Sequence, residues 1–192
     1  KIVSGHTENC KNLVNEFYKK VCQKTVIASS LEHAEMAKLY ENIFRSVNIG
    51  LANETKNICL KLGLDFNKIL KLSSTKPFGF MPFYSGPGVG GHCIPVDPFY
   101  LSWFAKKRKI NTQFIKLAGD INDSEPNNIV KKFRTILNKK SIKKTSKILI
   151  LGLSYKKNIS DVRNSPSLKI YQKLKNLKFN LDLNDDYVKK IK

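Results

Sequence analysis

A cysteine in a glycine- and proline-rich segment is the residue of this sequence best suited to chemistry. Residues 86–98 read GPGVGGHCIPVDP, so Cys93 is followed four residues later by Asp97. Glycine lets the backbone adopt conformations closed to other residues and lets a ligand approach the main chain. A cysteine fixed in such a loop is typical of a nucleophile. The alternative is a glycine-rich turn with an incidental thiol, because isolated cysteines are usually small buried hydrophobes.

A second candidate pair is Lys38 with Asn42. The two residues are four positions apart in a segment with helical spacing, so they share one face of the helix. Their neighbours are mostly apolar, and a lysine in such surroundings can donate a hydrogen bond to a developing oxyanion. The alternative is a solvated lysine paired with Glu35 or Glu41.

Two cations follow an apolar segment near the C-terminal end of the sequence. Lys156 and Arg163 come after residues 147–153, which read KILILGL and predict a strand. Cations beyond the carboxyl end of a parallel strand suit a phosphate ligand, because ligands bind there in open α/β sheets. The segment carries only Gly152 and therefore is not a dinucleotide fingerprint. The alternative is a pair of surface cations, with Arg163 bridged to Asp161.

A long helix must position Lys38 and Asn42. The spacing of apolar residues predicts it over 31–62, with Ser29 and Glu32 as a capping box and Gly63 as its C-terminal stop. Residues 43–52 are apolar on nearly every face, which indicates burial in a core or an interface. At ~1.5 Å per residue the helix would exceed about 40 Å. We therefore expect it to link domains and to pair with a second subunit.

The remaining segments predict helices that alternate with short strands. Residues 76–95 predict a loop, and residues 139–146 a charged linker. Ser124-Glu125-Pro126 has the pattern of a helix start, with the serine as cap and the proline in the first turn. The strand over 147–153 is expected to be buried and to open a parallel α/β unit. Further helices are expected over 7–21, 65–72, 98–107 and 166–177, and further strands over 25–28 and 179–183.

Composition narrows the class of protein. The 192 residues carry a net charge of +20, but the lysines are scattered, and no zinc finger or arginine-rich block is present, which disfavours sequence-specific nucleic-acid binding. No apolar run approaches the ~20 residues that a membrane span needs, and no signal peptide is visible. The four cysteines form no CxxC pair and no zinc spacing with histidine. We therefore expect a reduced, cytoplasmic protein without a metal site, a nucleic-acid partner or a membrane partner.

Three ordered blocks together resemble the UDP-glucose/GDP-mannose dehydrogenase family of UDP-sugar 6-dehydrogenases. They are AEMAKLYENIFRSVNIGLANE in the long helix, the loop STKPFGFMP with the later GPGVGGHCIPVDPFYL, and GLSYKKNISDVRNSP. GVGGHCIP is most similar to the branch that acts on UDP-N-acetylhexosamines. The resemblance covers essentially the whole chain. It implies an α/β fold, with a mainly helical central dimerisation domain followed by the start of a Rossmann-like UDP-binding domain.

The resemblance implies that a UDP-sugar 6-hydroxyl is oxidised twice by NAD to a carboxylate. Cys93 matches the nucleophile that holds the aldehyde as a thiohemiacetal and then a thioester. Lys38 and Asn42 match residues that polarise the oxygen and hold a water, and Asp97 matches a carboxylate that assists proton transfer. Arg163 matches a contact to NAD. The implied substrate-binding residues are Tyr84, Ser85, Gly88, Gly90, Gly91 and Lys156.

The resemblance also implies three parts: residues 1–29 as the tail of an NAD-binding domain, 30–140 as the central domain, and 141–192 as part of the UDP-binding domain. The family's enzymes are about twice this length, begin with a GxGxxG-bearing NAD domain, and carry a hydrolytic glutamate that would lie before Lys1. We therefore expect a fragment of a homodimeric, NAD-dependent UDP-N-acetylhexosamine 6-dehydrogenase. The alternative is an inactive remnant that keeps only the dimerising helix and part of the UDP site.

Overall fold

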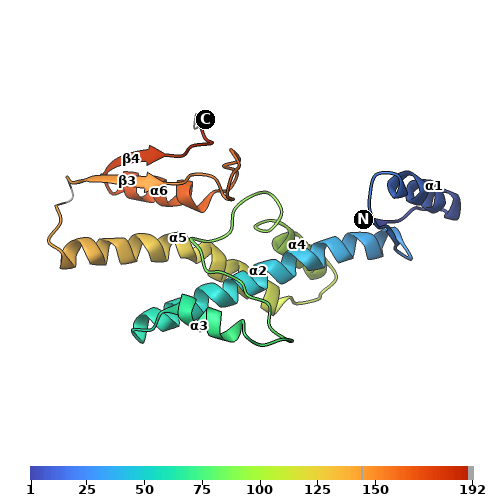
Figure 1. Ribbon diagram of the computed structural model, residues 1–192, viewed down its shortest axis with the longest axis horizontal. Helices are drawn as coiled ribbons and strands as arrows, with labels where there is room; N and C mark the ends of the chain where they lie inside the picture. Colours follow the sequence, from blue (N-terminus) through green and yellow to red (C-terminus); the bar gives the residue numbers. More distant parts are fainter. Residues whose placement is uncertain (144, 190–192) are drawn as a thin grey trace. The chain divides into compact units, whose positions relative to one another are not determined.

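The chain folds as two compact units, Lys1–Phe44 and Arg45–Lys192, in a computed structural model that describes residues 1–143 and 145–189. The fold is α/β and mainly helical, as the sequence predicts (Figure 1). Helix α2 begins in the first unit and continues into the second. The elements in chain order are β1 (Ile2–Val3), α1 (Glu8–Lys19), β2 (Val26–Ile27), α2 (Leu31–Lys61), α3 (Phe66–Ser73), α4 (Asp97–Lys107), α5 (Gln113–Lys139), β3 (Lys147–Leu151), α6 (Pro166–Asn176) and β4 (Asn180–Asn184).

The first unit contains a small strand–helix–strand arrangement. Strands β1 and β2 pair in parallel, with Ile2 opposite Val26, and α1 forms the crossover that parallel strands require. Thr7 caps α1, because its hydroxyl accepts the Cys10 N–H at 3.2 Å. The structure confirms the predicted helix and the strand near residue 26, and it adds β1, which the sequence reading did not include.

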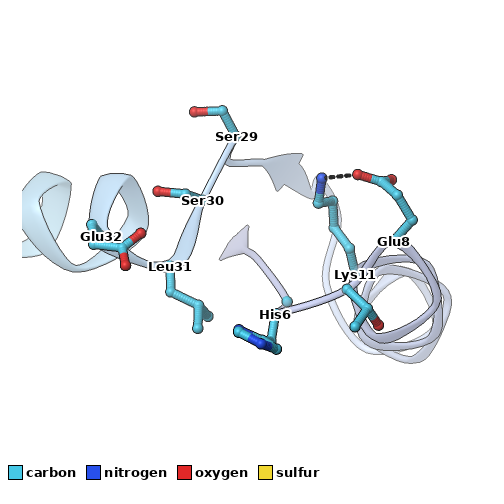
Figure 2. Close-up of a pocket in the computed structure, with 9 residues that line it drawn as sticks. His6, Glu8, Lys11, Ser29, Ser30, Leu31 and Glu32 are labelled. Atoms are coloured by element: carbon cyan, nitrogen blue, oxygen red, sulfur yellow. Dashed lines mark hydrogen bonds and ion pairs between the residues drawn. The ribbon is translucent and has the colours of Figure 1, made fainter.

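Two loop segments of the first unit line a small cavity of about 230 Å³ (Figure 2). One segment follows β1, and the other follows β2 and leads into α2. Figure 2 shows Lys11 turned toward Glu8, with which it forms an ion pair. The lining residues are Gly5, His6, Thr7, Glu8, Lys11, Ser29, Ser30, Leu31 and Glu32.

The start of α2 differs by one residue from the predicted capping box. Ser30, rather than Ser29, precedes the helix and accepts the His33 N–H through its hydroxyl at 3.3 Å. Ser30 also lowers the pKa of Glu32 by hydrogen bonding. The helix ends as predicted, because Gly63 adopts a φ of +71°, a left-handed conformation that suits glycine after a helix.

Residues 43–52 of α2 are not buried on every face. Ile43 and Ala52 are buried, whereas Phe44 and Leu51 are 40% and 60% exposed. The buried side of the helix in the second unit includes Gly50, where an added Cβ would stand 3.3 Å from the Ala118 carbonyl of α5. The apolar stretch therefore packs on one side within the chain and leaves large apolar side chains on the other.

Helix α5 is longer than the sequence predicts, because it begins at Gln113 and runs without interruption through Ser124 and Pro126. The prediction of a helix start at Ser124 is wrong. Its hydroxyl donates to the Ile121 carbonyl at 2.7 Å instead of capping a new helix. Tertiary packing overrides the local signal, because α5 is held along its length by α4 on one part and by α6 on another.

The end of the second unit repeats the strand–helix–strand arrangement. Strands β3 and β4 pair in parallel, and Lys147 lies opposite Asn180. The carboxylate of Asp185, just after β4, accepts the N–H groups of Leu153 and Ser154, and these backbone hydrogen bonds lower its pKa. The prediction that β3 is buried is wrong, because its residues alternate between half-buried and exposed. A two-stranded sheet covered by one helix leaves its other face open.

Candidate active site around Cys93

Cys93 lies in a connecting segment between α3 and α4 that contains no helix or strand, as predicted. Its thiol is free and exposed. The Cys93 carbonyl accepts the N–H of Val96 at 3.0 Å and that of Asp97 at 2.8 Å. These bonds form a tight turn that leads directly into α4, so the short spacing brings Cys93 and Asp97 together at the start of that helix.

The glycine-rich loop before Cys93 needs its glycines. Gly88 and Gly91 adopt φ values of +119° and +89°, where other residues are strained. An added Cβ at Gly90 would stand 2.5 Å from Cβ of Tyr155, and one at Gly91 would stand 2.8 Å from the Tyr155 ring. The loop therefore fits closely against the segment that follows β3.

The same segment binds the loop through hydrogen bonds. The Gly91 N–H donates to the Arg163 carbonyl at 2.8 Å, and the Asn164 side chain donates to the Gly91 carbonyl at 3.0 Å. Two segments about 70 residues apart in the sequence thus meet beside Cys93. In the sequence, both segments belong to blocks that resemble motifs of one family.

Arg163, whose carbonyl accepts the Gly91 N–H, carries a positive charge on the segment that binds the loop. Its guanidinium forms a two-point ion pair with Asp161, with contacts of 2.6 and 3.0 Å to one carboxylate oxygen. The pair raises the pKa of Arg163 and lowers that of Asp161. Cys93 contributes a smaller electrostatic effect on Arg163 in the same direction. Arg163 is 63% exposed, so its guanidinium is accessible to an anionic ligand.

The other predicted binding residues differ in their exposure. Lys156 is exposed, and its carbonyl accepts the Ser154 hydroxyl at 2.8 Å. Tyr84 is exposed, whereas Ser85 is half-buried. Ser85 lines a cavity of about 500 Å³ together with Lys56, Leu60, Gly63, Leu64, Asp65, Phe66 and Asn67.

Lys38 and Asn42 belong to the first unit, whereas Cys93 and Asp97 belong to the second. Asn42 is buried. Lys38 is 61% exposed and forms an ion pair with Glu41 at 3.2 Å, one of the two partners that the alternative interpretation named. The roles that the resemblance implies for these four residues in one reaction remain a prediction.

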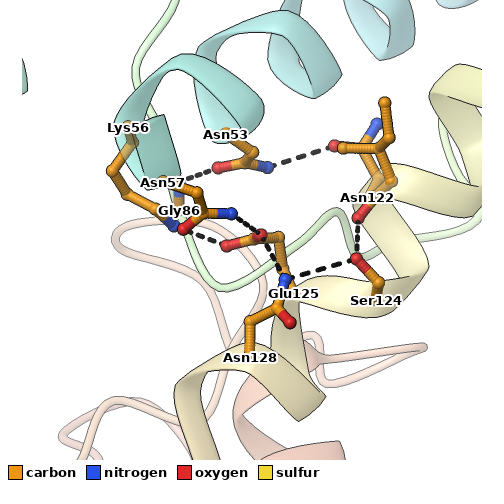
Figure 3. A network of polar contacts seen from close by, with 9 residues as sticks. Asn53, Lys56, Asn57, Gly86, Asn122, Ser124, Glu125 and Asn128 are labelled. Atoms are coloured by element: carbon orange, nitrogen blue, oxygen red, sulfur yellow. Dashed lines mark hydrogen bonds and ion pairs between the residues drawn. The ribbon is translucent and has the colours of Figure 1, made fainter. Parts of the chain in front are cut away.

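A buried polar network lies beside the loop, and the sequence reading missed it (Figure 3). Glu125 of α5 is fully buried and accepts hydrogen bonds from Lys56, Asn57 and Asn128. Burial raises the pKa of Glu125, but the three hydrogen bonds outweigh it, so the pKa lies below its usual value. The sequence signal available for this network was Glu125 next to Pro126. By its local pattern alone, that pair was interpreted as the start of a helix.

The spacing of the glycines in this loop also matches a dinucleotide-binding motif, which the structure does not support here. Gly86, Gly88 and Gly91 have the G-x-G-x-x-G spacing of a dinucleotide fingerprint. That motif acts where a strand runs directly into a helix. Here no strand precedes the loop, and α4 begins only at Asp97. The loop is therefore suited to hold a thiol rather than a pyrophosphate.

Within residues 1–143 and 145–189, no group of three or more His, Cys, Asp or Glu side chains is placed to hold a metal ion. Among those residues, no helix combines the length and the apolar character needed to cross a membrane.

An exposed thiol therefore lies on a glycine loop that is hydrogen-bonded to the segment after β3. Family models give the class of protein. The central domain of the UDP-glucose/GDP-mannose dehydrogenase family matches residues 32–124, and its UDP-binding domain matches residues 149–192. The chain belongs to this family.

Individual relatives support the same assignment. A UDP-N-acetyl-D-mannosamine dehydrogenase of Methanococcus maripaludis is 36% identical over 91% of this chain and 39% of its own length. A UDP-N-acetyl-D-glucosamine 6-dehydrogenase of Pseudomonas aeruginosa is 34% identical over 98% of this chain and 44% of its own length. The solved UDP-D-ManNAc dehydrogenase of Pyrococcus horikoshii superposes with a TM-score of 0.88 at 33% identity, over 98% of this chain and 44% of that one. The chain thus spans about two fifths of the length of these relatives.

Proposed function

We propose that this chain is the central and UDP-binding part of an NAD-dependent dehydrogenase that oxidises C6 of a UDP-N-acetylhexosamine to the carboxylate. The observation that carries the proposal is the exposed Cys93 thiol on a close-fitting glycine loop beside Arg163. The relatives described above are named for UDP-N-acetylmannosamine and UDP-N-acetylglucosamine, which supports this substrate class.

Cys93 would act as the nucleophile. Its sulfur would add to the C6 aldehyde and give a thiohemiacetal, whose carbon again carries a hydrogen and a hydroxyl. The aldehyde alone has no hydroxyl to oxidise, so the thiol makes the second two-electron oxidation feasible. The resulting thioester would be hydrolysed by water, which releases the acid and restores the thiol. Asp97, whose backbone N–H binds the Cys93 carbonyl in the same turn, would assist proton transfer.

The remaining residues would position the reactants. Lys38 would stabilise negative charge on the reacting oxygen, and Asn42 would hold the water. Lys156 would contact the UDP-sugar, together with Tyr84, Ser85 and the backbone of Gly88, Gly90 and Gly91. A glycine loop lets a polar ligand such as a sugar approach the main chain closely.

NAD would supply the hydride acceptor for both oxidations. Arg163 fits a contact to this anionic cofactor, because its guanidinium is exposed and its backbone binds the glycine loop that carries Cys93. Leu51 on α2 supports the further proposal that the chain forms a homodimer through this helix, because it is a large apolar side chain that is 60% exposed in a single chain.

The test compares Cys93→Ser with Cys10→Ser, which changes another exposed thiol outside the proposed site. Both changes are made in an enzyme that joins this chain to an NAD-binding domain. Uronate release is measured with UDP-N-acetylglucosamine and UDP-N-acetylmannosamine, each with NAD, and UDP-sugar binding is measured by calorimetry. Cys10→Ser should match the parent. Cys93→Ser should bind the UDP-sugar but lose uronate release by at least about 10²-fold, because serine is a far poorer nucleophile and leaving group.

Two results would contradict the proposal. Cys93→Ser that releases uronate at the parent rate would exclude the covalent role of the thiol. A parent protein that binds UDP-sugar without releasing uronate would support the alternative of a non-catalytic binding module.

A further inference from the structure

The side chain of Asn53 joins helix α2 to the glycine-rich loop. Asn53 is fully buried, and its carbonyl oxygen Oδ1 accepts the Gly86 N–H at 2.9 Å (Figure 3). Its amide nitrogen Nδ2 donates to Oδ1 of Asn122 on α5 at 3.1 Å. Both ends of the amide are therefore used, as a buried polar group requires.

Asn122 fixes the orientation of this pair. Its Nδ2 donates to the Ser46 carbonyl at 2.8 Å, and Asn122 is itself buried. Donation thus runs in one direction, from the Gly86 N–H through Asn53 and Asn122 to the Ser46 carbonyl. Rotating either amide by 180° would place two donors or two acceptors opposite each other. The acceptor presented to Gly86 is therefore set by the helices and not by the loop.

Pro126 brings a second part of the loop to the same place. Proline has no N–H, so it cannot donate to the carbonyl of Asn122 one helical turn earlier. The loop approaches that carbonyl, because an added Cβ at Gly88 would stand 2.9 Å from the Asn122 oxygen and 3.5 Å from Cδ of Pro126. Asn122 of α5 therefore lies against the loop at Gly88 through its backbone carbonyl. Its side chain is also linked to Gly86 through Asn53.

We propose that Asn53 and Asn122 are positioning residues that hold the loop so that the Cys93 thiol is correctly placed. Gly86 is fixed by Asn53 at one end of the loop, and Gly91 is fixed by the Arg163 carbonyl at the other. Cys93 follows two residues after Gly91. The inference rests on the proposed function in one respect only, that Cys93 is the reacting group.

The first experiment measures amide hydrogen exchange of the loop peptide in Asn53→Ala. Losing one hydrogen bond should speed exchange of residues 86–91 by about 3- to 10-fold. Asn57→Ala is the matched control, because it removes an amide from the same helix but contacts Glu125 and not the loop. Its loop exchange should equal that of the parent.

The reactivity of a buried thiol distinguishes release of the loop from general unfolding. Cys59 is 4% exposed on α2, so iodoacetamide should modify it slowly in every folded variant. A merely structural role of Asn53 would increase Cys59 modification along with loop exchange. A positioning role should leave Cys59 protected while the loop exchanges faster.

A pair of loop variants tests the same bond without altering a buried side chain, in case Asn53→Ala fails to fold. Gly86→Pro removes the N–H that Asn53 binds, whereas Gly86→Ala keeps it. An added Cβ there would meet only the Gly88 carbonyl, at 3.8 Å. Loop exchange should be faster in Gly86→Pro and unchanged in Gly86→Ala.

The final comparison is the kcat for uronate release in Asn53→Ala and Asn57→Ala. Only Asn53→Ala should lower it, by about the same 3- to 10-fold. Unchanged loop exchange in Asn53→Ala or Gly86→Pro would show that Asn53 does not hold the loop. Faster exchange with unchanged kcat would show that Asn53 does not position the Cys93 thiol. If Cys93→Ser instead keeps the parent rate, the proposed function fails, while the exchange result still decides whether Asn53 holds the loop.

Discussion

Replacing Glu125 with glutamine should strongly destabilise the second unit. The Glu125 carboxylate is fully buried and accepts hydrogen bonds from Lys56, Asn57 and Asn128, the latter two at 2.8 and 3.0 Å. Glutamine keeps one acceptor but places an NH₂ group where a carboxylate oxygen was. Lys56 then loses its negative partner and faces a second donor.

The magnitude follows from burial of the pair. Breaking a fully buried ion pair by removing one partner costs about 3–5 kcal/mol. The Lys56 side chain is 20% exposed, so water can solvate part of its charge after the change. We therefore expect the free energy of unfolding to fall by about 2–4 kcal/mol.

The assay is urea unfolding followed by the fluorescence of Trp103, the only tryptophan of the chain. Trp103 lies on α4, which packs on α5, so it reports on the unit that contains Glu125. The control is Asp123→Asn on the same helix. Its ion pair with Lys169 is 3.5 Å long and about half exposed, so its loss should cost less than about 0.5 kcal/mol. Equal costs for the two variants, or a loss below about 1 kcal/mol for Glu125→Gln, would refute this reasoning.

The same residue predicts a pH dependence. The folded-state pKa of Glu125 is lowered, so its contribution to stability is complete above the ordinary carboxyl value of 4.5. It is lost as the pH falls through the lower folded-state pKa. Stability of the parent should therefore decrease in acid below pH 4.5 more steeply than that of Glu125→Gln. Parallel acid profiles would contradict the assignment.

Two further predictions concern the loop and the dimer. Gly91→Ala combines a φ of +89° with a clash against an aromatic ring, whereas Gly152→Ala has a φ of +86° and open space, so urea unfolding should show a cost for Gly91→Ala larger by at least about 1 kcal/mol. Equal costs would show that the ring moves aside freely. In sedimentation at micromolar concentration the parent should be a dimer, and Leu51→Lys on α2 should weaken it by at least about 100-fold, because two symmetric copies each lose roughly 1.5–3 kcal/mol of burial. Leu72→Lys on α3 is the control, because Leu72 is 71% exposed, and it should leave the dimer intact. A monomeric parent would contradict the proposal of a homodimer.

The sequence by itself determined the family, most of the secondary structure and the position of the glycine-rich loop that carries Cys93. Helix ends followed from local signals that act within one turn, such as Gly63 after α2. Gly88 and Gly91 were named from the family resemblance, and their positive φ values show why glycine is needed there. The Cys93–Asp97 turn also came from sequence, since four residues close a single helical turn.

Tertiary structure decided the features that depend on residues far apart in the chain. Ser124-Glu125-Pro126 has the local pattern of a helix start, but packing against α4 and α6 keeps α5 continuous there. Three polar residues of types that usually lie at the surface are buried here: Asn53, Asn122 and Glu125. They are buried because each has hydrogen-bond partners on another element. Such pairings span 69 residues of sequence, and no local pattern encodes them. The fold thus adds to the sequence the buried polar contacts beneath the Cys93 loop.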